Sequence, residues 1–211
     1  MDILFQDRRI VVAVKPSGVL STDEPGGMPA LLRQELHTEC IRTVHRLDAP
    51  VSGLMVFARS AYAAGDLSRQ IREGTFEKHY LAVLRGAPPE REGTLTDLLA
   101  RDKETRLTHV VTTREKGVQE ARLRYRVLDS RAGLTLVQVQ LLTGRTHQIR
   151  VQFAARGCPL AGDGKYGGKG SAPLLWSYRL SFPDPRDGRM QTFEKSPENP
   201  PWEALFAEKQ Q

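Results

Sequence analysis

The chain has 211 residues, of which 31 are basic and 25 are acidic, so its formal net charge is +6. Hydrophobic residues make up 39% of the chain, which suffices for a folded core and excludes a wholly disordered protein. No apolar run approaches the ~18 to 20 residues that span a bilayer, and the first residues lack the pattern of a secretory signal. We expect a cytoplasmic protein without membrane contact that forms one domain over residues 1–211.

The hydrophobic pattern predicts many strands and few helices. Short β-branched or alternating apolar runs indicate strands, and apolar residues three or four positions apart indicate helices. In chain order, we expect a strand at 9–14, a helix at 29–37, a strand at 54–58, a helix at 61–72, strands at 78–84, 121–128 and 134–142, a helix at 146–156 and a strand at 174–182.

Local signals refine this pattern. Ser60 is a favourable N-cap for the helix at 61–72, and Gly74 ends that helix. The two alternating strands that flank a turn-rich loop at 129–133 predict an antiparallel hairpin, and its first strand has a basic outer face. The tail, 197–211, is Pro-rich and then weakly amphipathic. Together these elements predict an α+β fold with a mixed, mainly antiparallel β-sheet and flanking helices.

The positive charge is concentrated in one segment. Residues 141–180 hold six basic residues and one acid, Asp163, which gives a net charge of +5, whereas residues 85–126 mix ten basic with seven acidic residues. A segment almost free of acids is a candidate for a phosphate-facing surface. Charge alone leaves three roles open for it: nucleic-acid binding, an acidic protein partner, and solubility.

The sequence contains no metal-binding pattern. Cys40 and Cys158 form no C-x-x-C pair, and the five histidines lack the H-E-x-x-H spacing. Glycine-rich nucleotide-binding signatures are also missing. We therefore expect two reduced thiols and no metal or cofactor.

Three stretches carry candidate functional side chains: 44–53, 77–83 and 142–151. Asp48 lies in a turn-rich loop, where a desolvated carboxylate needs a cation such as Arg46 or Arg150. Such a pair would keep Asp48 ionised, as a nucleophile or a base. The alternative is that Asp48 only caps the loop or pairs with Arg46.

Three ring-bearing side chains in these stretches have two interpretations each. His45 and His147 both lie beside an arginine, and each is either a packed, hydrogen-bonded histidine or a contact to an RNA phosphate or base. Tyr80 is either a core residue of its strand or an aromatic surface on which a base stacks.

Taken together, the motifs resemble the RluA family of pseudouridine synthases. The string H-R-L-D at 45–48, followed by Ser52-Gly53, resembles the signature of that family. Four further stretches resemble family motifs: K-P-S-G at 15–18, K-H-Y-L-A at 78–82, G-R-T-H-Q-I-R at 144–150, and the glycine-rich stretch at 162–167. The matches run in the family's order over about residues 10–182, which is far more specific than one short string.

The resemblance implies an enzyme that isomerises uridines within ribosomal or transfer RNA. The bond from ribose to base nitrogen 1 breaks, the uracil turns, and a carbon–carbon bond forms at base carbon 5. The family pattern implies that Asp48 is the essential carboxylate and Arg150 its basic partner. It also implies that Tyr80 stacks on the uracil and helps to remove the proton from carbon 5. The target uridine has to be flipped out of its helix first.

The resemblance also implies a set of substrate contacts. Ile149 is expected to wall the base pocket, Arg46 to fill the gap that the flipped uridine leaves, and the basic segment to contact phosphates. The expected substrate-binding residues are His45, Arg46, Arg145, His147, Ile149 and Lys165. We expect a monomer with RNA as its partner and with no obligate protein partner.

The chain departs from the family pattern in two places. Val51 stands where relatives commonly have Thr, so we expect packing in place of a hydroxyl hydrogen bond, and Pro50 stiffens the same loop. The first family-like strand begins near residue 10, so we expect no separate N-terminal RNA-binding domain. Two alternative functions are a catalytically inactive RNA-binding protein of the same fold, and a hydrolase with Asp48 as nucleophile and Asp163 as second acid.

Overall fold

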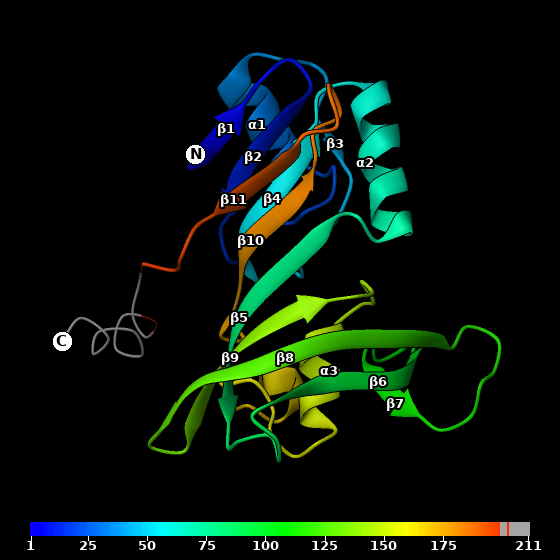
Figure 1. Cartoon of the computed structure of the whole chain (residues 1–211), viewed down its shortest axis with the longest axis vertical. Helices are drawn as coiled ribbons and strands as arrows, with labels where there is room; N and C mark the ends of the chain where they lie inside the picture. Colours follow the sequence, from blue (N-terminus) through cyan, green and yellow to red (C-terminus); the bar gives the residue numbers. More distant parts are fainter. Residues whose placement is uncertain (199–201, 203–211) are drawn as a thin grey trace.

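A long, twisted β-sheet runs through the molecule in the strand order β1-β2-β4-β10-β5-β9-β8-β6-β7, with β11 paired to β10 and β3 to β4 (Figure 1). The computed structural model describes residues 1–198 and 202. Within them, neighbouring strands are antiparallel except for β4 and β10, which are parallel. This arrangement confirms the prediction of an α+β fold with a mixed, mainly antiparallel sheet.

The elements have the following bounds. The strands are β1 (Ile3–Gln6), β2 (Ile10–Lys15), β3 (Arg42–Thr43), β4 (Ser52–Ala58), β5 (Glu77–Arg85), β6 (Glu92–Arg101), β7 (Thr108–Val111), β8 (Gln119–Arg131), β9 (Leu134–Leu141), β10 (Leu175–Pro183) and β11 (Met190–Glu194). The helices are α1 (Met28–Leu36), α2 (Ala61–Glu73), α3 (Gln148–Ala154) and the 3-10 helix η1 (Gly164–Tyr166).

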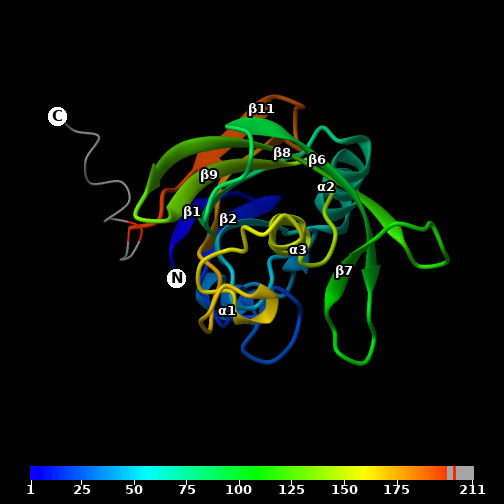
Figure 2. The same ribbon diagram turned by 90° about the horizontal axis from the view of Figure 1, so that it is seen from below.

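The helices cover the two faces of the sheet unequally. α1 and α3 lie under its concave side, which is clearest in the view from below (Figure 2). Leu32 of α1 and Phe153 of α3 join the same core as Val11, Met55 and Ala82 of the strands. α2 packs on the opposite face, against β2, β4 and β10. The central strands β2 and β4 are therefore buried on both faces, which explains their nearly continuous apolar runs.

The helix α2 follows its sequence signals closely. The hydroxyl of Ser60 accepts a hydrogen bond from the Ala63 N–H at 3.1 Å, and Gly74 ends the helix in the left-handed conformation. By contrast, α3 is shorter than the predicted 146–156. His147 has φ 56°, a left-handed backbone angle that an α-helix cannot include, so the helix begins only after it.

The hairpin of β8 and β9 forms as predicted, but its connection is tighter. The strands reach Arg131 and Leu134, and Ala132 and Gly133 alone make the turn, both with positive φ. A two-residue turn of this kind matches the natural twist of antiparallel strands. Five strands were not predicted: β1, β3, β6, β7 and β11. β6 and β7 lie in the segment of mixed charge, whose polar side chains hide the strand pattern.

No helix in residues 1–198 or at 202 is long and apolar enough to cross a membrane. The predicted amphipathic tail at 197–211 lies almost entirely outside the described residues.

Candidate active site

A cavity of about 1400 Å³ opens where the two halves of the sheet meet. It is lined by the loop before β4, the start of β5, the segment from β9 to α3, and the loop around η1. A smaller recess of about 60 Å³ shares Asp48, Tyr80, His147 and Arg150 with it and adds Ile149. Each of the site residues proposed from the sequence lines one or both of these spaces.

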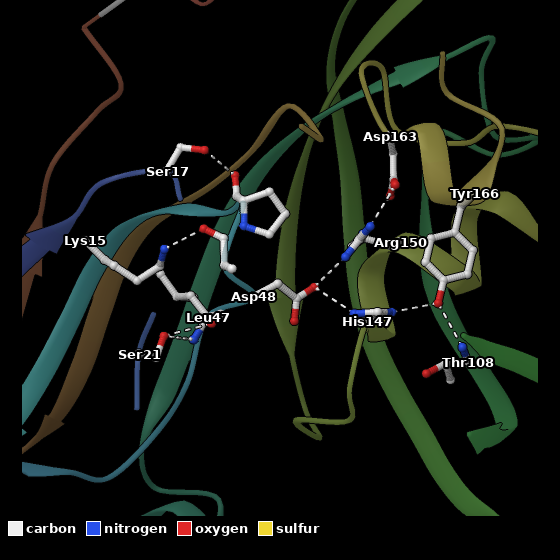
Figure 3. Close-up of polar contacts among 12 residues, drawn as sticks. Lys15, Ser17, Ser21, Leu47, Asp48, Thr108, His147, Arg150, Asp163 and Tyr166 are labelled. Atoms are coloured by element: carbon white, nitrogen blue, oxygen red, sulfur yellow. Dashed lines mark hydrogen bonds and ion pairs between the residues drawn. The ribbon is translucent and has the colours of Figure 1, made fainter. Parts of the chain in front are cut away.

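The loop that carries Asp48 is held by serine hydroxyl groups from the N-terminal part of the chain. The Ser21 hydroxyl donates to the Leu47 carbonyl at 2.8 Å and accepts from the Leu47 N–H at 3.0 Å. The Ser17 hydroxyl donates to the Pro50 carbonyl at 3.0 Å. These bonds fix the backbone on both sides of Asp48, as Figure 3 shows.

Lys15 is the main support under this loop. Its side chain is fully buried, and Nζ donates to the carbonyls of Pro16, Val19 and Ala49 at 2.7 to 2.9 Å. Burial lowers the pKa of Lys15 to about 8, while the charge of Asp48 opposes the shift. The lysine therefore ties the K-P-S-G turn to the residue that follows Asp48.

The end of the loop depends on a glycine and a valine. Gly53 has φ 119° and pairs with Ser177 of β10, and a Cβ at this position would clash with the Ser177 carbonyl oxygen. Val51 is 2% exposed and belongs to the main core, as expected for a residue that packs.

Arg150 joins two carboxylates. Its Nη1 donates to Asp48 Oδ2 at 2.9 Å, and its Nε and Nη2 donate to the two oxygens of Asp163 at 2.7 and 2.8 Å. Arg150 and Asp163 are buried, whereas the Asp48 side chain is 24% exposed. Burial alone would lower the pKa of Arg150, but the hydrogen bonds and charges of Asp163 and Asp48 outweigh it and raise that pKa. Arg150 is therefore a permanent cation.

This geometry gives the two acids different roles. Both oxygens of Asp163 accept from Arg150, and its side chain is 1% exposed, so it orients the guanidinium. Among the described residues, no hydrogen bond reaches Asp48 Oδ1, and this oxygen is free for a substrate. Arg46, the other cation proposed for Asp48, makes no ion pair within the described part of the chain.

His147 faces the same oxygen of Asp48 as Arg150 does. Its Nε2 lies 3.8 Å from Asp48 Oδ2, and its Nδ1 lies 2.8 Å from the Tyr166 hydroxyl (Figure 3). That hydroxyl accepts from the Thr108 N–H at 2.9 Å, so its own proton is free to go to His147 Nδ1. Because Nε2 faces the carboxylate of Asp48, we assign the ring proton of neutral His147 to Nε2, and Nδ1 then accepts from the Tyr166 hydroxyl.

The pKa of His147 agrees with a neutral ring. Burial lowers it, the charge of Asp48 opposes the shift, and the charges of Arg150 and Lys165 lower it further. Tyr166 also lies under the Arg150 guanidinium, whose central carbon is 5.1 Å from the ring centroid. η1 thus supports both basic residues that face Asp48.

Tyr80 is 4% exposed and lies on the concave face of β5, on the cavity wall. Burial raises the pKa of its phenol above the usual range, and the charge of Asp48 adds to the effect. The phenol is therefore neutral at physiological pH. Its neighbour in the recess, Ile149, is also 4% exposed, and together they give an apolar boundary.

The basic residues differ in how firmly they are held. Arg46 and Lys165 are exposed at the rim of the cavity. Arg145 is half-buried, and its Nε donates to the Glu120 carbonyl at 2.9 Å, which ties it to β8.

His45 occupies a more enclosed position than a substrate contact requires. It is 8% exposed, its Nε2 accepts from the Val56 N–H at 3.1 Å, and its ring packs 5.5 Å from that of Phe76. Burial, followed by the charge of Lys78, lowers its pKa to about 3. His45 is thus a neutral, packed histidine that holds its loop to β4, which corresponds to the structural interpretation of this residue.

Reasoning from sequence gave no role to several residues that shape the site: Lys15, Ser21, Lys78, Thr108 and Tyr166. Lys15, Lys78 and Tyr166 stand inside motifs that the sequence displays, which is the signal that could have singled them out. Ser21 and Thr108 carry no such signal, because their roles depend on contacts across the fold.

Comparison with known proteins adds independent findings. Residues 9–155 match the family model for RNA pseudouridylate synthases. The chain is 34% identical over 209 residues to the uncharacterized RNA pseudouridine synthase YlyB of Bacillus subtilis, which covers 92% of this chain and 68% of that protein. It is 32% identical over 217 residues to ribosomal large subunit pseudouridine synthase D of Neisseria meningitidis serogroup A, which covers 92% of this chain and 57% of that protein. The chain thus spans about two thirds or less of the length of these relatives.

A solved structure is similar over almost the whole fold. Human RNA Pseudouridylate Synthase Domain Containing 1 superposes with a TM-score of 0.78 and 26% sequence identity, over 98% of this chain and 86% of that chain.

Proposed function

Because the chain belongs to the RNA pseudouridylate synthase family, we propose that it converts uridine within an RNA chain to pseudouridine. The observation that carries the proposal is the Asp48 carboxylate, ion-paired to Arg150 at 2.9 Å in a cavity that Tyr80 also lines. The product is an isomer of the substrate: the bond from ribose carbon 1 to base nitrogen 1 breaks, and one to base carbon 5 forms. Carbon 5 loses its proton and nitrogen 1 gains one.

Asp48 is the group that starts the reaction in this proposal. Arg150 holds Oδ2, which leaves Oδ1 to face the nucleotide. The contact with Arg150 limits the rotation of the Asp48 carboxylate, which favours an oriented nucleophile or base. The Nε2–H of His147, 3.8 Å from Oδ2, faces the same carboxylate and stabilises its charge beside Arg150.

Tyr80 and Ile149 form the base pocket. In this proposal the Tyr80 ring stacks on the uracil. Because burial raises the pKa of its phenol, Tyr80 stays protonated at neutral pH and does not itself take the carbon 5 proton, which passes to water. The uracil can reach this position only after it leaves its helix. Arg46 at the rim takes the space that the flipped uridine vacates, while Arg145 and Lys165 contact phosphates.

The same geometry argues against the two alternative functions, an inactive RNA-binding protein and a hydrolase. A binding protein that has lost its activity would have no need for the Asp48–Arg150–Asp163 array, which spans three separate segments of the chain. A glycoside-type hydrolase needs a second carboxyl group that can give or take a proton. Both oxygens of Asp163 are already occupied by Arg150, and its side chain is buried.

The RNA of the large ribosomal subunit is the first substrate to test, because one relative is named for it. Transfer RNA is the second. The proposal retains the expectations of a monomer that acts in the cytoplasm, which rest on the sequence alone.

The experiment compares pseudouridine maps of total RNA from cells that produce the parent protein, the Asp48→Asn variant, or neither. We expect at least one pseudouridine that depends on the parent protein and is missing with Asp48→Asn. Purified Asp48→Asn should bind the same RNA within about twofold of the parent, since the two side chains are nearly isosteric. Identical maps in all three cell lines would refute the proposal.

A further inference from the structure

Two largely buried lysines lie close to the cavity, and they differ in the hydrogen-bond partners of their ammonium groups. Lys15 is fully buried and donates to three carbonyl oxygens. Lys78 is 9% exposed, but within the described part of the chain its Nζ makes no hydrogen bond and has no carboxylate within 4.0 Å. The buried cation Arg150 has two carboxylate partners. Among the described residues, Lys78 is therefore the largely buried cation of this site that has no partner.

A largely buried lysine whose ammonium lines a cavity without a partner in the described part of the chain needs an explanation. Moving a charge out of water is costly unless a partner compensates it. Burial lowers the pKa of Lys78, and no neighbouring acid offsets that shift. A side chain that served only to fill space in β5 would be better apolar, as Tyr80 and Ala82 on the same face are. The position thus favours a cation whose partner comes from outside the protein.

The location of Lys78 narrows the kind of partner. Lys78 and Tyr80 are two residues apart on β5, so both point to the concave face, with their backbones about 7 Å apart. Both side chains line the large cavity, but only Tyr80 reaches the recess that contains Asp48 and Ile149. Lys78 lies one step outward from the base pocket, where the backbone of a bound nucleotide would run.

The segment across from Lys78 leaves this ammonium accessible. A Cβ on Gly144 would lie 3.2 Å from the Lys78 Nζ, closer than an ordinary contact, so the glycine leaves room for the ammonium at the cavity wall. The next residue, Arg145, lines the same cavity and contributes a second positive charge. In contrast, Asp48 and Asp163 outweigh Arg150 by one negative charge deeper in the site.

We propose that Lys78 is the binding site for a phosphate of the RNA backbone next to the flipped uridine. The inference rests on the proposed function and extends it by assigning the anion that this cation receives. The phosphate supplies the missing counter-charge, and Lys78 offsets the repulsion between that phosphate and Asp48. Pairing with phosphate keeps Lys78 protonated, so RNA binding at alkaline pH is accompanied by proton uptake.

The test separates a binding role from a structural one by measuring stability and affinity together. The variants are Lys78→Met and, as a matched control, Lys116→Met at an exposed position away from the cavity, both made in an Asp48→Asn background. We expect Lys78→Met to unfold at a higher temperature than its background, because a buried unpaired charge is gone. It should nevertheless bind a uridine-containing RNA stem–loop about 5- to 20-fold more weakly.

Two further readouts identify the phosphate. The slope of log K against log salt should fall by about 0.7 to 0.9 in Lys78→Met, the value for one lost phosphate contact, and should not change in Lys116→Met. Calorimetry in two buffers of different ionisation enthalpy should detect proton uptake on binding, and Lys78→Met should abolish it. Parental affinity and salt slope in Lys78→Met, whatever its stability, would overturn the inference.

A different measurement, pseudouridine formation by the parent protein, decides whether the proposed function is correct. If the parent protein forms no pseudouridine, the function is wrong however Lys78 behaves. If it forms pseudouridine and Lys78→Met binds RNA as tightly as its background, only the phosphate assignment is wrong.

Discussion

Replacing Arg150 by Met should remove activity and also destabilise the protein strongly. The change breaks three hydrogen bonds and leaves the carboxylate of Asp163, which is 1% exposed, without a counter-charge. Leaving one member of a buried ion pair behind typically costs about 3 to 5 kcal/mol. For a chain of this size, roughly 2 to 4 °C per kcal/mol gives a fall in Tm of about 6 to 20 °C.

The assay is urea unfolding at neutral pH, followed by circular dichroism, with a second variant to identify the cause. If the loss comes from the unpaired Asp163, the double change Arg150→Met with Asp163→Asn should recover most of the stability, because the buried charge is gone. It should not recover pseudouridine formation, since Asp48 still lacks its partner. A fall of less than about 1 kcal/mol in Arg150→Met, or a double variant no more stable than the single one, would refute this reasoning.

Three further changes test the supports of the site. Tyr166→Phe removes the hydroxyl that donates to His147 Nδ1. Nitrogen-15 NMR should then show the Nε2–H tautomer of His147 in the parent and a mixture of both tautomers in the variant. Equal spectra would contradict the tautomer assignment. In Lys15→Met, three carbonyls lose their donor, and a loss of about 3 kcal/mol is expected. The pKa of Lys15 is about 8 in the folded protein and 10.5 ordinarily, so between these pH values the unfolded chain binds more protons than the folded one. The free energy of unfolding of the parent, relative to that of Lys15→Met, should therefore rise from pH 8 to 10.5. A difference that does not change with pH would contradict the lowered pKa. Gly53→Ala should cost about 3 kcal/mol in denaturant unfolding, through backbone strain and the clash with Ser177, and a neutral effect would argue against the parallel β4–β10 contact.

The residues that motifs identify could be placed before any coordinates were known. Asp48, Tyr80 and Arg150 stand in three stretches whose order and spacing resemble one family, and all three line one cavity. Local chemistry also sufficed for α2, where Ser60 and Gly74 mark both ends.

Features that depend on contacts between distant segments could not be predicted from the sequence. The contact between Thr108 and Tyr166 requires β7, which the mixed charges of its segment conceal. The left-handed backbone of His147 shortens α3 and turns the ring toward Asp48, and a favourable helical pattern gives no hint of it.

The two lysines show the same limit most clearly. Lys15 and Lys78 are alike in sequence terms, because each opens a motif next to a strand. Only the fold gives Lys15 three carbonyl partners and leaves Lys78 without one in the described part of the chain. His45 is a further example: its position beside Arg46 left both a packed histidine and an RNA contact open, and its burial against Val56 and Phe76 supports the packed interpretation.

The central claim is that Asp48 acts on a uridine that the cavity holds, and loss of the carbon 5 proton reports this directly. Purified protein is incubated with RNA whose uridines carry tritium at carbon 5, and tritium released to water is counted. We predict release by the parent protein that stops after a small number of uridines per RNA, and a rate at least about 10³-fold lower for Asp48→Asn, which corresponds to about 4 kcal/mol of lost transition-state stabilisation. Release by Asp48→Asn at a rate close to that of the parent would contradict the account.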